Sequence, residues 1–514
     1  MKPRALLRCS TLLPFALLAA SATASAQPPP APPSVPAAPA LPPPSKDALA
    51  AALAPRVGGL TAEDAAKLAV KSKPSVRAKQ EDLKAAAAKV DQALVNFFPR
   101  VSLSATYTRL SNVTGFSLGG GAIVGAANAG PLQAVCTGTG PCAVLDSKGT
   151  PVGAQQVSFP VPLNSYSFVA SVAVPVSDYV FRIAQGYSAA SHNEKAARLT
   201  AEAETLQVAA DAKVAYFNWV RAKGSVVVAS EAVEQARAHV EDAKKAFGVG
   251  LASKADVLRI EAQLAAAQQS QAEAQAFVSI ADEQLRVVTG LPPDRALEIG
   301  SDVMNEAATP PADALPALQD QALSRRLEIR ALDETIYSLK RVESVAKAGY
   351  LPRLDAFADA NYSNPNQRIF PQKDEFNFTW DVGLRLSWTL NDTFTTIGAA
   401  AEAKARAASV NEQKGTLRDG LRMEVAAAYA DVSKAPATIE AADRGFVAAE
   451  ESLRVRRELF RNGKATSSEL VDAEAELTRA RLRRLDAHVG LLVAKAKLDH
   501  ATGRDVPARP AGSN

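Results

Sequence analysis

Strict alternation of apolar and polar side chains marks the stretch Phe376–Leu390 as a strand. Every second residue from Phe376 is apolar, and the residues between are polar, charged or glycine. A period of two is that of a β-strand, whose successive side chains point to opposite faces. Three further segments alternate in the same way, over 100–110, 165–176 and 353–362. The pattern therefore predicts four strands.

Two long segments between and after the strands, 181–247 and 397–460, carry a helical pattern instead. Apolar or small residues recur in alternating steps of four and three, which is a strict seven-residue repeat typical of left-handed coiled-coil packing. The seam is mostly Ala and Val, so neighbouring helices can approach closely. Each segment would be about 100 Å long as a helix, which suits a shaft or tube and no globular core. Pro436 predicts a kink in the second long helix.

The order helix, strand, strand, long helix, turn, helix occurs twice, so the chain contains an internal repeat. Phe247 and Gly250 at the end of the first long helix match Phe460 and Gly463, each pair 213 residues apart. The main difference is the loop between the strands, which is long in the first half and short in the second. The remaining helices are predicted over 61–96, which Thr61 caps and Pro74 interrupts, and over 254–289, 317–347 and 468–500.

These patterns divide the chain into six parts. Residues 1–26 have the basic start, the apolar run and the small-residue cleavage site of a secretory signal peptide. The mature chain has no apolar run of the length that a transmembrane helix needs, so it can enter a membrane only through strands closed into a barrel. The other parts are a Pro-rich tether over 27–60, a first repeat over 61–290 with its tip at 248–253, a linker over 291–316, a second repeat over 317–503 with its tip at 461–467, and a tail over 504–514.

Charge and cysteine content add two expectations. Removal of the signal peptide lowers the formal net charge from +4 to +1, and nothing in the sequence argues for a nucleic-acid partner. Cys136 and Cys142 remain in the exported chain. The oxidising compartment favours one local disulfide between them, with two free thiols as the alternative.

The four strands are long enough to cross a bilayer, with their apolar sides towards lipid and their polar sides towards water. A soluble sandwich is the alternative, but two hairpins separated by long helices do not supply its second sheet. Four strands cannot close a barrel with a wet interior, so several subunits must share one. The pattern thus predicts a homo-oligomer.

The doubled order of elements, together with the turn sequences GLASKADVLRIEAQL and GKATSSELVDAEAEL, resembles the TolC family of outer membrane efflux proteins over about Thr61 to Gly503. The fold class that this resemblance implies is mainly α with transmembrane β. A trimer would form a twelve-stranded outer-membrane barrel, continuous with a periplasmic coiled-coil barrel of helices. The implied partners are outer-membrane lipid, a periplasmic adaptor protein and an inner-membrane pump of the RND, ABC or MFS type.

In this family the turns between the long helices dock the adaptor. The corresponding tips here are Val249-Gly250-Leu251 and Asn462-Gly463-Lys464. Glycine suits both, because a tight turn requires a positive φ. The first tip matches the usual form of the family. The second departs from it, since Lys464 stands where a small or apolar residue is common.

Glu469 and Asp472 follow the second tip, and the resemblance places acidic residues of these positions at the periplasmic constriction. Threefold symmetry would gather their carboxylates into a ring that favours cations. The alternative for Glu469 is an ordinary acid at a helix N-terminus, stabilised by the helix dipole. Asp256, its counterpart in the first half, is followed at the next turn by Arg259, which indicates a structural role.

The sequence argues against an enzyme. The four histidines have no metal-binding spacing, and no nucleotide or metalloprotease motif occurs, so no cofactor or metal is expected. We therefore expect the passive exit duct of a tripartite efflux or type I secretion system. The alternatives are a duct for protein secretion in place of small molecules, and a periplasmic coiled-coil scaffold without a pore.

Overall fold

The computed structural model describes residues 48–506, apart from 113–116, 119–129, 137, 139–141, 153–156, 159–161 and 371. The predicted signal peptide, the tether up to residue 47 and the end of the tail lie outside the described residues. Among the described helices, none combines the length and the apolar character that a membrane crossing requires.

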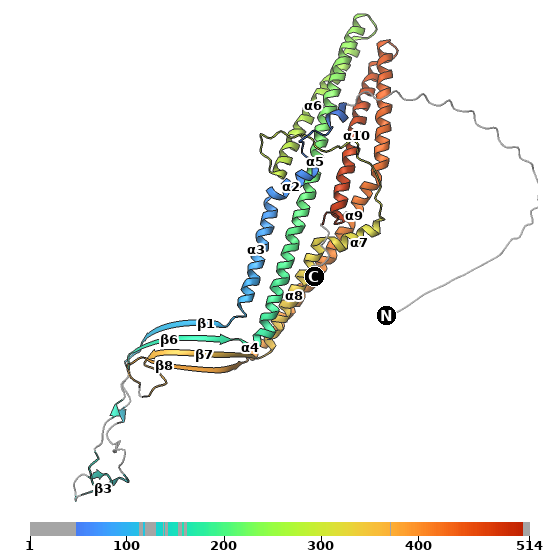
Figure 1. The fold of residues 1–514 in the computed structure, drawn as a ribbon. Helices are drawn as coiled ribbons and strands as arrows, with labels where there is room; N and C mark the ends of the chain where they lie inside the picture. The colour runs from blue at the N-terminus through green and yellow to red at the C-terminus, as the bar shows by residue number, and fades with distance from the viewer. Residues whose placement is uncertain are drawn as a thin grey trace, which may run out of the picture. The chain divides into compact units, whose positions relative to one another are not determined.

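All four predicted strands are present and form one antiparallel sheet in the order β1-β6-β7-β8 (Figure 1). The alternation of side chains predicted the two hairpins, but it did not predict that they pair with each other to form one sheet. Residues of β6 in the first repeat pair with residues of β7 in the second, from Tyr166 opposite Asn364 to Val174 opposite Ala356. The strands are β1 (Arg100–Arg109), β6 (Asn164–Val174), β7 (Arg353–Asn364) and β8 (Asn377–Ser387). The long loop between β1 and β6 contains two short antiparallel pairs, β2 (Ser117–Leu118) with β5 (Val157–Ser158) and β3 (Gln133–Val135) with β4 (Ala143–Leu145).

Helices occupy the rest of both repeats, and the long ones lie side by side (Figure 1). The first repeat contains α2 (Ala62–Ser72), α3 (Pro74–Val95), α4 (Val176–Asp178), the π-helix η1 (Tyr179–Ile183), α5 (Ala184–Gly248) and α6 (Lys254–Thr289), preceded by α1 (Ala48–Ala52). The second contains α7 (Leu315–Arg325), α8 (Leu327–Lys347), the 3₁₀ turn η2 (Ala348–Tyr350), α9 (Leu390–Arg461) and α10 (Ser467–Ala501). The repeat predicted from sequence is thus visible element by element.

The helix predicted over 317–347 is wrong in one respect, because it breaks into α7 and α8 at Arg326. This residue has an extended backbone, with φ −59° and ψ 125°. Its guanidinium is buried and donates hydrogen bonds to Glu328, to Glu424 and to the carbonyl oxygen of His500. The break corresponds to the one at Pro74 in the first repeat, but no proline announces it, so the pattern alone could not reveal it.

The boundary between β8 and α9 also differs from the prediction. The alternating stretch was expected to remain a strand to Leu390, but β8 ends at Ser387 and α9 begins at Leu390. Trp388 and Leu390 are apolar and exposed, 58% and 62%, so their side chains continue the alternation after the strand has ended. Alternation of side chains cannot locate this boundary.

The predicted heptad seam forms the core between the helices. Val208, Ala212 and Trp219 of α5 are buried, as are Val425 and Val432 of α9. Pro436 lies inside α9, which continues through it. The close approach expected from small residues is clearest at Gly224 of α5, where an added Cβ would lie 2.7 Å from Cδ2 of Leu485 on α10. A larger residue at this position would force the side chain of Leu485 or the two helices to shift.

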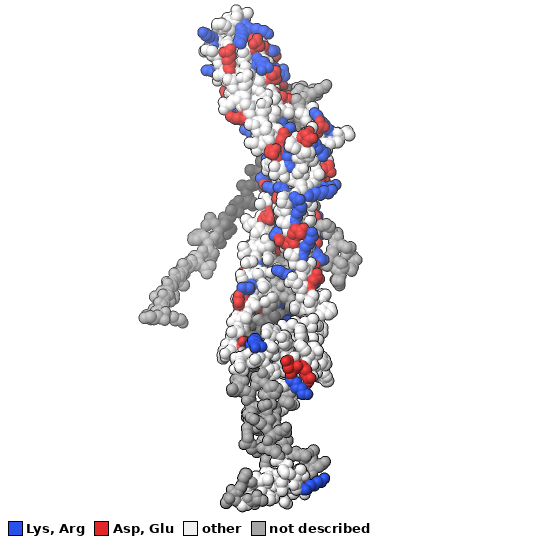
Figure 2. All heavy atoms as spheres, turned by 90° about the vertical axis from the view of Figure 1, so that its left-hand side faces the viewer, with Lys and Arg blue, Asp and Glu red and all other residues white. Residues whose placement is uncertain are grey.

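The sheet presents an apolar face to its surroundings. Leu103 of β1 is 81% exposed, and Trp380, Val382 and Leu384 of β8 are exposed by 65–71%. Figure 2 shows charged side chains gathered over the helices, while the strands carry few in that view. Exposed apolar area on this scale marks a surface that contacts lipid or protein.

Candidate functional site

The first helix turn, between α5 and α6, ends α5 with a glycine in the left-handed region. Gly250 has φ +78°, and its N–H donates to the carbonyl oxygen of Phe247 over 3.0 Å. The N–H of Leu251 donates to the carbonyl oxygen of Ala246 over 2.8 Å. These two hydrogen bonds are those of a Schellman motif, which satisfies carbonyl groups that the end of a helix leaves free. Val249 and Leu251 project from this turn with 72% and 57% exposure.

The second turn, between α9 and α10, repeats this geometry. Gly463 has φ +67°, and its N–H donates to the carbonyl oxygen of Phe460 over 3.0 Å. The N–H of Lys464 donates to the carbonyl oxygen of Leu459 over 2.8 Å. Lys464 therefore takes the place that Leu251 has in the first turn, where an apolar residue usually packs back on the helix. The sequence difference between the tips changes the exposed side chain and leaves the backbone turn the same.

Both turns continue into a helix that begins with a capping box. In α6, the side chain of Ser253 accepts from the N–H of Asp256, and the Asp256 carboxylate accepts from the N–H of Ser253. In α10, Thr466 and Glu469 form the same reciprocal pair. The two tips thus share cap, glycine and capping box at a constant separation of 213 residues.

The two tips also contact each other. The hydroxyl of Ser467 is buried and donates to Oδ1 of Asp256 over 2.5 Å, which joins the starts of α10 and α6. A Cβ added at Gly463 would lie 3.7 Å from Cδ2 of Leu251, so the second turn lies against the first. Hydrogen bonds from Ser253 and Ser467 lower the pKa of Asp256 below its usual value, as its predicted structural role requires.

Glu469 uses both of its carboxylate oxygens within the chain. Oε2 accepts from the N–H of Thr466 over 2.9 Å, and Oε1 accepts from Nη1 of Arg456 on α9 over 2.6 Å. The backbone hydrogen bond from Thr466 and the nearby Arg456 hold the pKa of Glu469 below its usual value. This arrangement supports the helix-terminus alternative for Glu469, and the carboxylate is still partly exposed.

Asp472 differs from Glu469 in having no side-chain partner among the residues that the structure describes. Its side chain is exposed, and it forms no ion pair with any residue in the part of the chain that the structure describes. It lies one helical turn after Glu469 on α10. Of the two acids predicted at the constriction, Asp472 is the one whose charge is not engaged inside the subunit.

Two interacting pairs of residues near the tips were missed from the sequence. Arg456 and Glu469 lie at equal distances on either side of Asn462-Gly463, so the symmetry of a helical hairpin could have paired them. His239 of α5 and Glu474 of α10 form a buried pair, with Nε2 and Oε1 2.5 Å apart. The partner of His239 comes from the other repeat, and no spacing rule indicates it.

The two cysteines lie in the loop between β1 and β6. The structure joins Cys136 and Cys142 by a disulfide, next to the ends of β3 and β4. The three consecutive glycines at 119–121 lie outside the described residues. Nothing else in the described part of this loop gathers polar side chains around a cavity.

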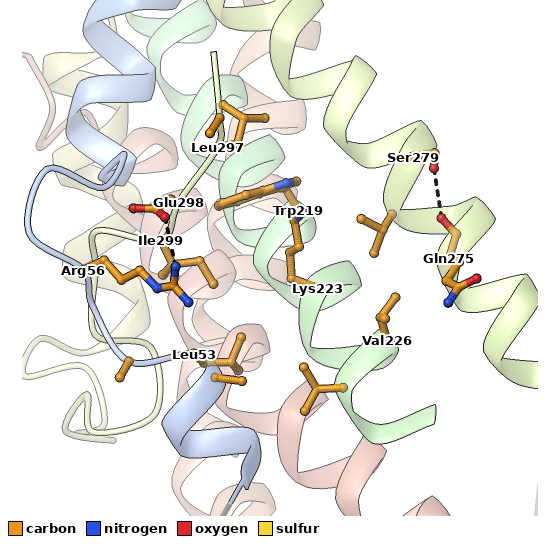
Figure 3. Close-up of a pocket in the computed structure, with 15 residues that line it drawn as sticks. Leu53, Arg56, Trp219, Lys223, Val226, Gln275, Ser279, Leu297, Glu298 and Ile299 are labelled. Carbon is orange, nitrogen blue, oxygen red and sulfur yellow. Dashed lines mark hydrogen bonds and ion pairs between the residues drawn. The ribbon is translucent and has the colours of Figure 1, made fainter. Parts of the chain in front are cut away.

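A cavity of about 550 Å³ lies between α1, α5, α6 and the linker, close to Trp219 (Figure 3). Its charged side chains neutralise one another. Arg56 pairs with Glu298 over 2.9 Å, and Lys223 lies 3.5 Å from Asp282, which also accepts from Nε1 of Trp219. Most of the other lining residues are apolar. The charged groups of this cavity are thus paired with one another, and the tips remain the candidate site.

A sheet with an exposed apolar face, joined to paired helices that end in two matched turns, defines a subunit of a membrane channel with a long helical part. A profile of the outer membrane efflux protein family matches residues 65–291 and 318–504. The chain belongs to this family. A search among curated protein sequences finds no match.

Solved structures of outer-membrane proteins have the same fold. The outer-membrane channel OprN is 19% identical, with a TM-score of 0.67 over 89% of this chain and 96% of that one. CusC is 14% identical, with a TM-score of 0.68 over 86% and 92%. VceC from Vibrio cholerae is 16% identical, with a TM-score of 0.67 over 86% and 96%.

Membership of the family confirms the main expectations drawn from the sequence. The chain is an outer-membrane efflux channel and not an enzyme. It works as a homotrimer with a periplasmic adaptor protein and an inner-membrane pump, and its large helical part lies in the periplasm. Three subunits with four strands each supply the twelve strands expected from the resemblance.

Proposed function

We propose that the two helix turns form the adaptor-docking end of the efflux duct, and that Asp472 and Glu469 line its periplasmic constriction. The observation that carries this proposal is the contrast between the two acids. Glu469 is held in place by Arg456 and Thr466, while Asp472, one turn further along α10, is exposed and unpaired. In a trimer, three copies of each carboxylate would form a ring that attracts cations.

The docking role rests on exposure. Val249 and Leu251 are apolar and exposed at the first turn, and Lys464 presents a cation at the second. A partner that fits this end would combine apolar contacts with an acceptor for the lysine. Protein interfaces of this kind bury an apolar centre within a polar rim.

Single-channel conductance of the purified trimer in a planar bilayer tests the constriction. Asp472→Asn is expected to lower the selectivity for cations, because it removes one ring of carboxylates from the constriction. Glu469→Gln is expected to change selectivity less, because that carboxylate is already paired. Glu476→Gln is the matched control, since Glu476 lies on the same exposed face of α10 but pairs with Arg479 and Arg483. If the three variants and the wild type have the same conductance and selectivity, Asp472 and Glu469 do not line a constriction. The result would not argue against a channel.

A photo-crosslinking residue placed at Val249 tests docking in cells that make the adaptor and the pump. We expect it to capture the adaptor, whereas the same residue at Ile280, which is 65% exposed on α6, should not. Capture at both positions or only at Ile280 would place the adaptor along the helices instead of at the tips.

A further inference from the structure

A second cavity lies where the helices meet the strands, and arginines dominate its wall. Its volume is about 350 Å³. It is bounded by the end of α3, the starts of β1 and β7, the π-helix η1 and the start of α5. Its charged and polar lining residues are Asn96, Arg100, Asp178, Arg182, Tyr187 and Arg353.

Asp178 carries the one carboxylate among these lining residues. This single negative charge does not balance the positive charges of the three guanidinium groups. Its Oδ2 lies 3.2 Å from Nη2 of Arg353, and its Oδ1 lies 3.7 Å from Nε of Arg182. The Nε atoms of both arginines are buried and have no hydrogen-bond partner in the structure. Arg100 forms no ion pair with any of the residues that the structure describes. The cavity wall therefore carries more donors and more positive charge than its own acid can satisfy.

The nearest further acid does not remove this excess. Asp355 lies 3.6 Å from Arg353, but it stands opposite Arg385 in the pairing of β7 with β8. Asp355 is also not among the residues that line the cavity. Arg385 itself lies over the ring of Phe357, with 4.9 Å between the guanidinium carbon and the ring centre.

The register of the strands places the arginines on the polar face of the sheet. Arg100 pairs with Ala173, and Ala173 pairs with Phe357, so these three residues share one face. Arg353 is four residues before Phe357 on the same strand and lies on that face too. The exposed apolar residues, such as Leu103 and Val382, lie on the opposite face. In a trimer with its apolar face in lipid, the polar face lines the lumen.

We propose that this cavity is an anion-binding site on the inner wall of the duct, which takes carboxylate or phosphate groups of the solutes that pass. The proposal rests on the proposed function, because it needs an open lumen. Guanidinium groups bind both kinds of group through charge-assisted and bidentate hydrogen bonds. The phosphate of a lipid headgroup has the same chemistry, but it would have to reach the face of the sheet that is turned away from lipid. Three copies of the cluster would make the junction of tube and strands attract anions, whereas the tips attract cations.

Citrate is a suitable probe because it carries three carboxylates. We expect citrate to block the single-channel current of the wild type, and Arg100→Gln to weaken this block about tenfold, the loss expected for one charge-assisted hydrogen bond. Arg100 has no partner to lose, so this variant should fold. Arg182→Gln is expected to act in the same direction. Arg385→Gln is the matched control on the same face of the sheet and should leave the block unchanged.

Calorimetric titration of citrate into the detergent-solubilised trimer keeps the test independent of conduction. Binding that is lost in Arg100→Gln and kept in Arg385→Gln supports the site even where no current flows, and a missing current would count against the proposed constriction alone. Equal citrate affinity in all variants overturns the anion site. Copurification of an anionic phospholipid that Arg100→Gln abolishes, with unchanged citrate block, would assign the cavity to lipid and also overturn it.

Discussion

The buried hydroxyl of Ser467 donates a hydrogen bond to Asp256 over 2.5 Å, and this bond joins the beginnings of α10 and α6 at the tips of the two repeats. Ser467 and Asp256 do not stand at equivalent positions of the two repeats, so this contact does not follow the symmetry of the repeat. Asp256 also caps its own helix through Ser253. One carboxylate therefore fixes a helix start and holds the second tip against the first.

Ser467→Ala should loosen the tips without unfolding the helices. The substitution removes the hydroxyl that donates to the partly exposed carboxylate of Asp256, a loss of about 1–3 kcal/mol for a hydrogen bond to a charged group. We expect amide hydrogen exchange in the first turns of α6 and α10 to become about tenfold faster, while exchange in the sheet stays the same. Ser468→Ala is the control, because Ser468 is the exposed neighbour and forms no such bond. Faster exchange in both variants would mean that the contact with Asp256 is unimportant.

Arg456→Gln should change how Glu469 responds to pH. The paired arginine is one of the causes that hold the pKa of Glu469 below its usual value, so its loss raises that pKa. Glu469 would then become protonated at a higher pH. We expect the cation selectivity of the channel, measured by reversal potential, to fall at a higher pH in Arg456→Gln than in the wild type.

Arg454→Gln is the matched control for that experiment. Arg454 lies two residues before Arg456 on α9, but it pairs with Glu451 and does not contact Glu469. Its removal should leave the pH dependence of selectivity where it is in the wild type. The same shift in both variants would show a general effect of charge on α9 and contradict the specific pairing.

Alanine at the tip glycines should destabilise the turns. Gly250 and Gly463 have φ of +78° and +67°, and a residue with a Cβ loses about 1–2 kcal/mol in this region. Gly445→Ala is the opposite case, because Gly445 lies inside α9 with open space around an added Cβ, and the helix should gain about 1 kcal/mol. Thermal dissociation of the trimer compares them, and a loss of stability in all three would contradict the argument from φ.

The sequence predicts features that depend on residues close together in the chain, and it does not predict contacts between residues far apart in the chain. The strands, the long helices and the paired tips follow from local periodicity and from glycine and capping residues, and the structure has them close to the predicted places. The helix break at Arg326 could not be predicted in this way, because the side chain of Arg326 is held by partners in α9 and α10. The pairing of Ser467 with Asp256 and the arginine cavity at Arg100 join segments of different repeats, and no local pattern encodes such contacts.

The buried histidine of the α5–α10 seam predicts a pH dependence of stability. His239 is 1% exposed, lies 2.5 Å from Glu474 and faces Arg457, Arg461 and Asp242. Burial, with a further contribution from Arg457, lowers the pKa of His239 from 6.5 to about 4. Between these two pH values the unfolded chain binds a proton at this histidine and the folded chain does not.

Stability should therefore fall as the pH falls from 6.5 to about 4, by on the order of 3 kcal/mol per subunit, and should not fall further from this cause below pH 4. We expect the dissociation temperature of the trimer to decrease over this range, and His239→Gln to flatten the decrease. His192→Gln, at a more exposed seam histidine that pairs with Glu334, is the comparison variant. A rise in stability towards pH 4 would mean that His239 becomes charged in the folded chain and that its contact with Glu474 outweighs its burial.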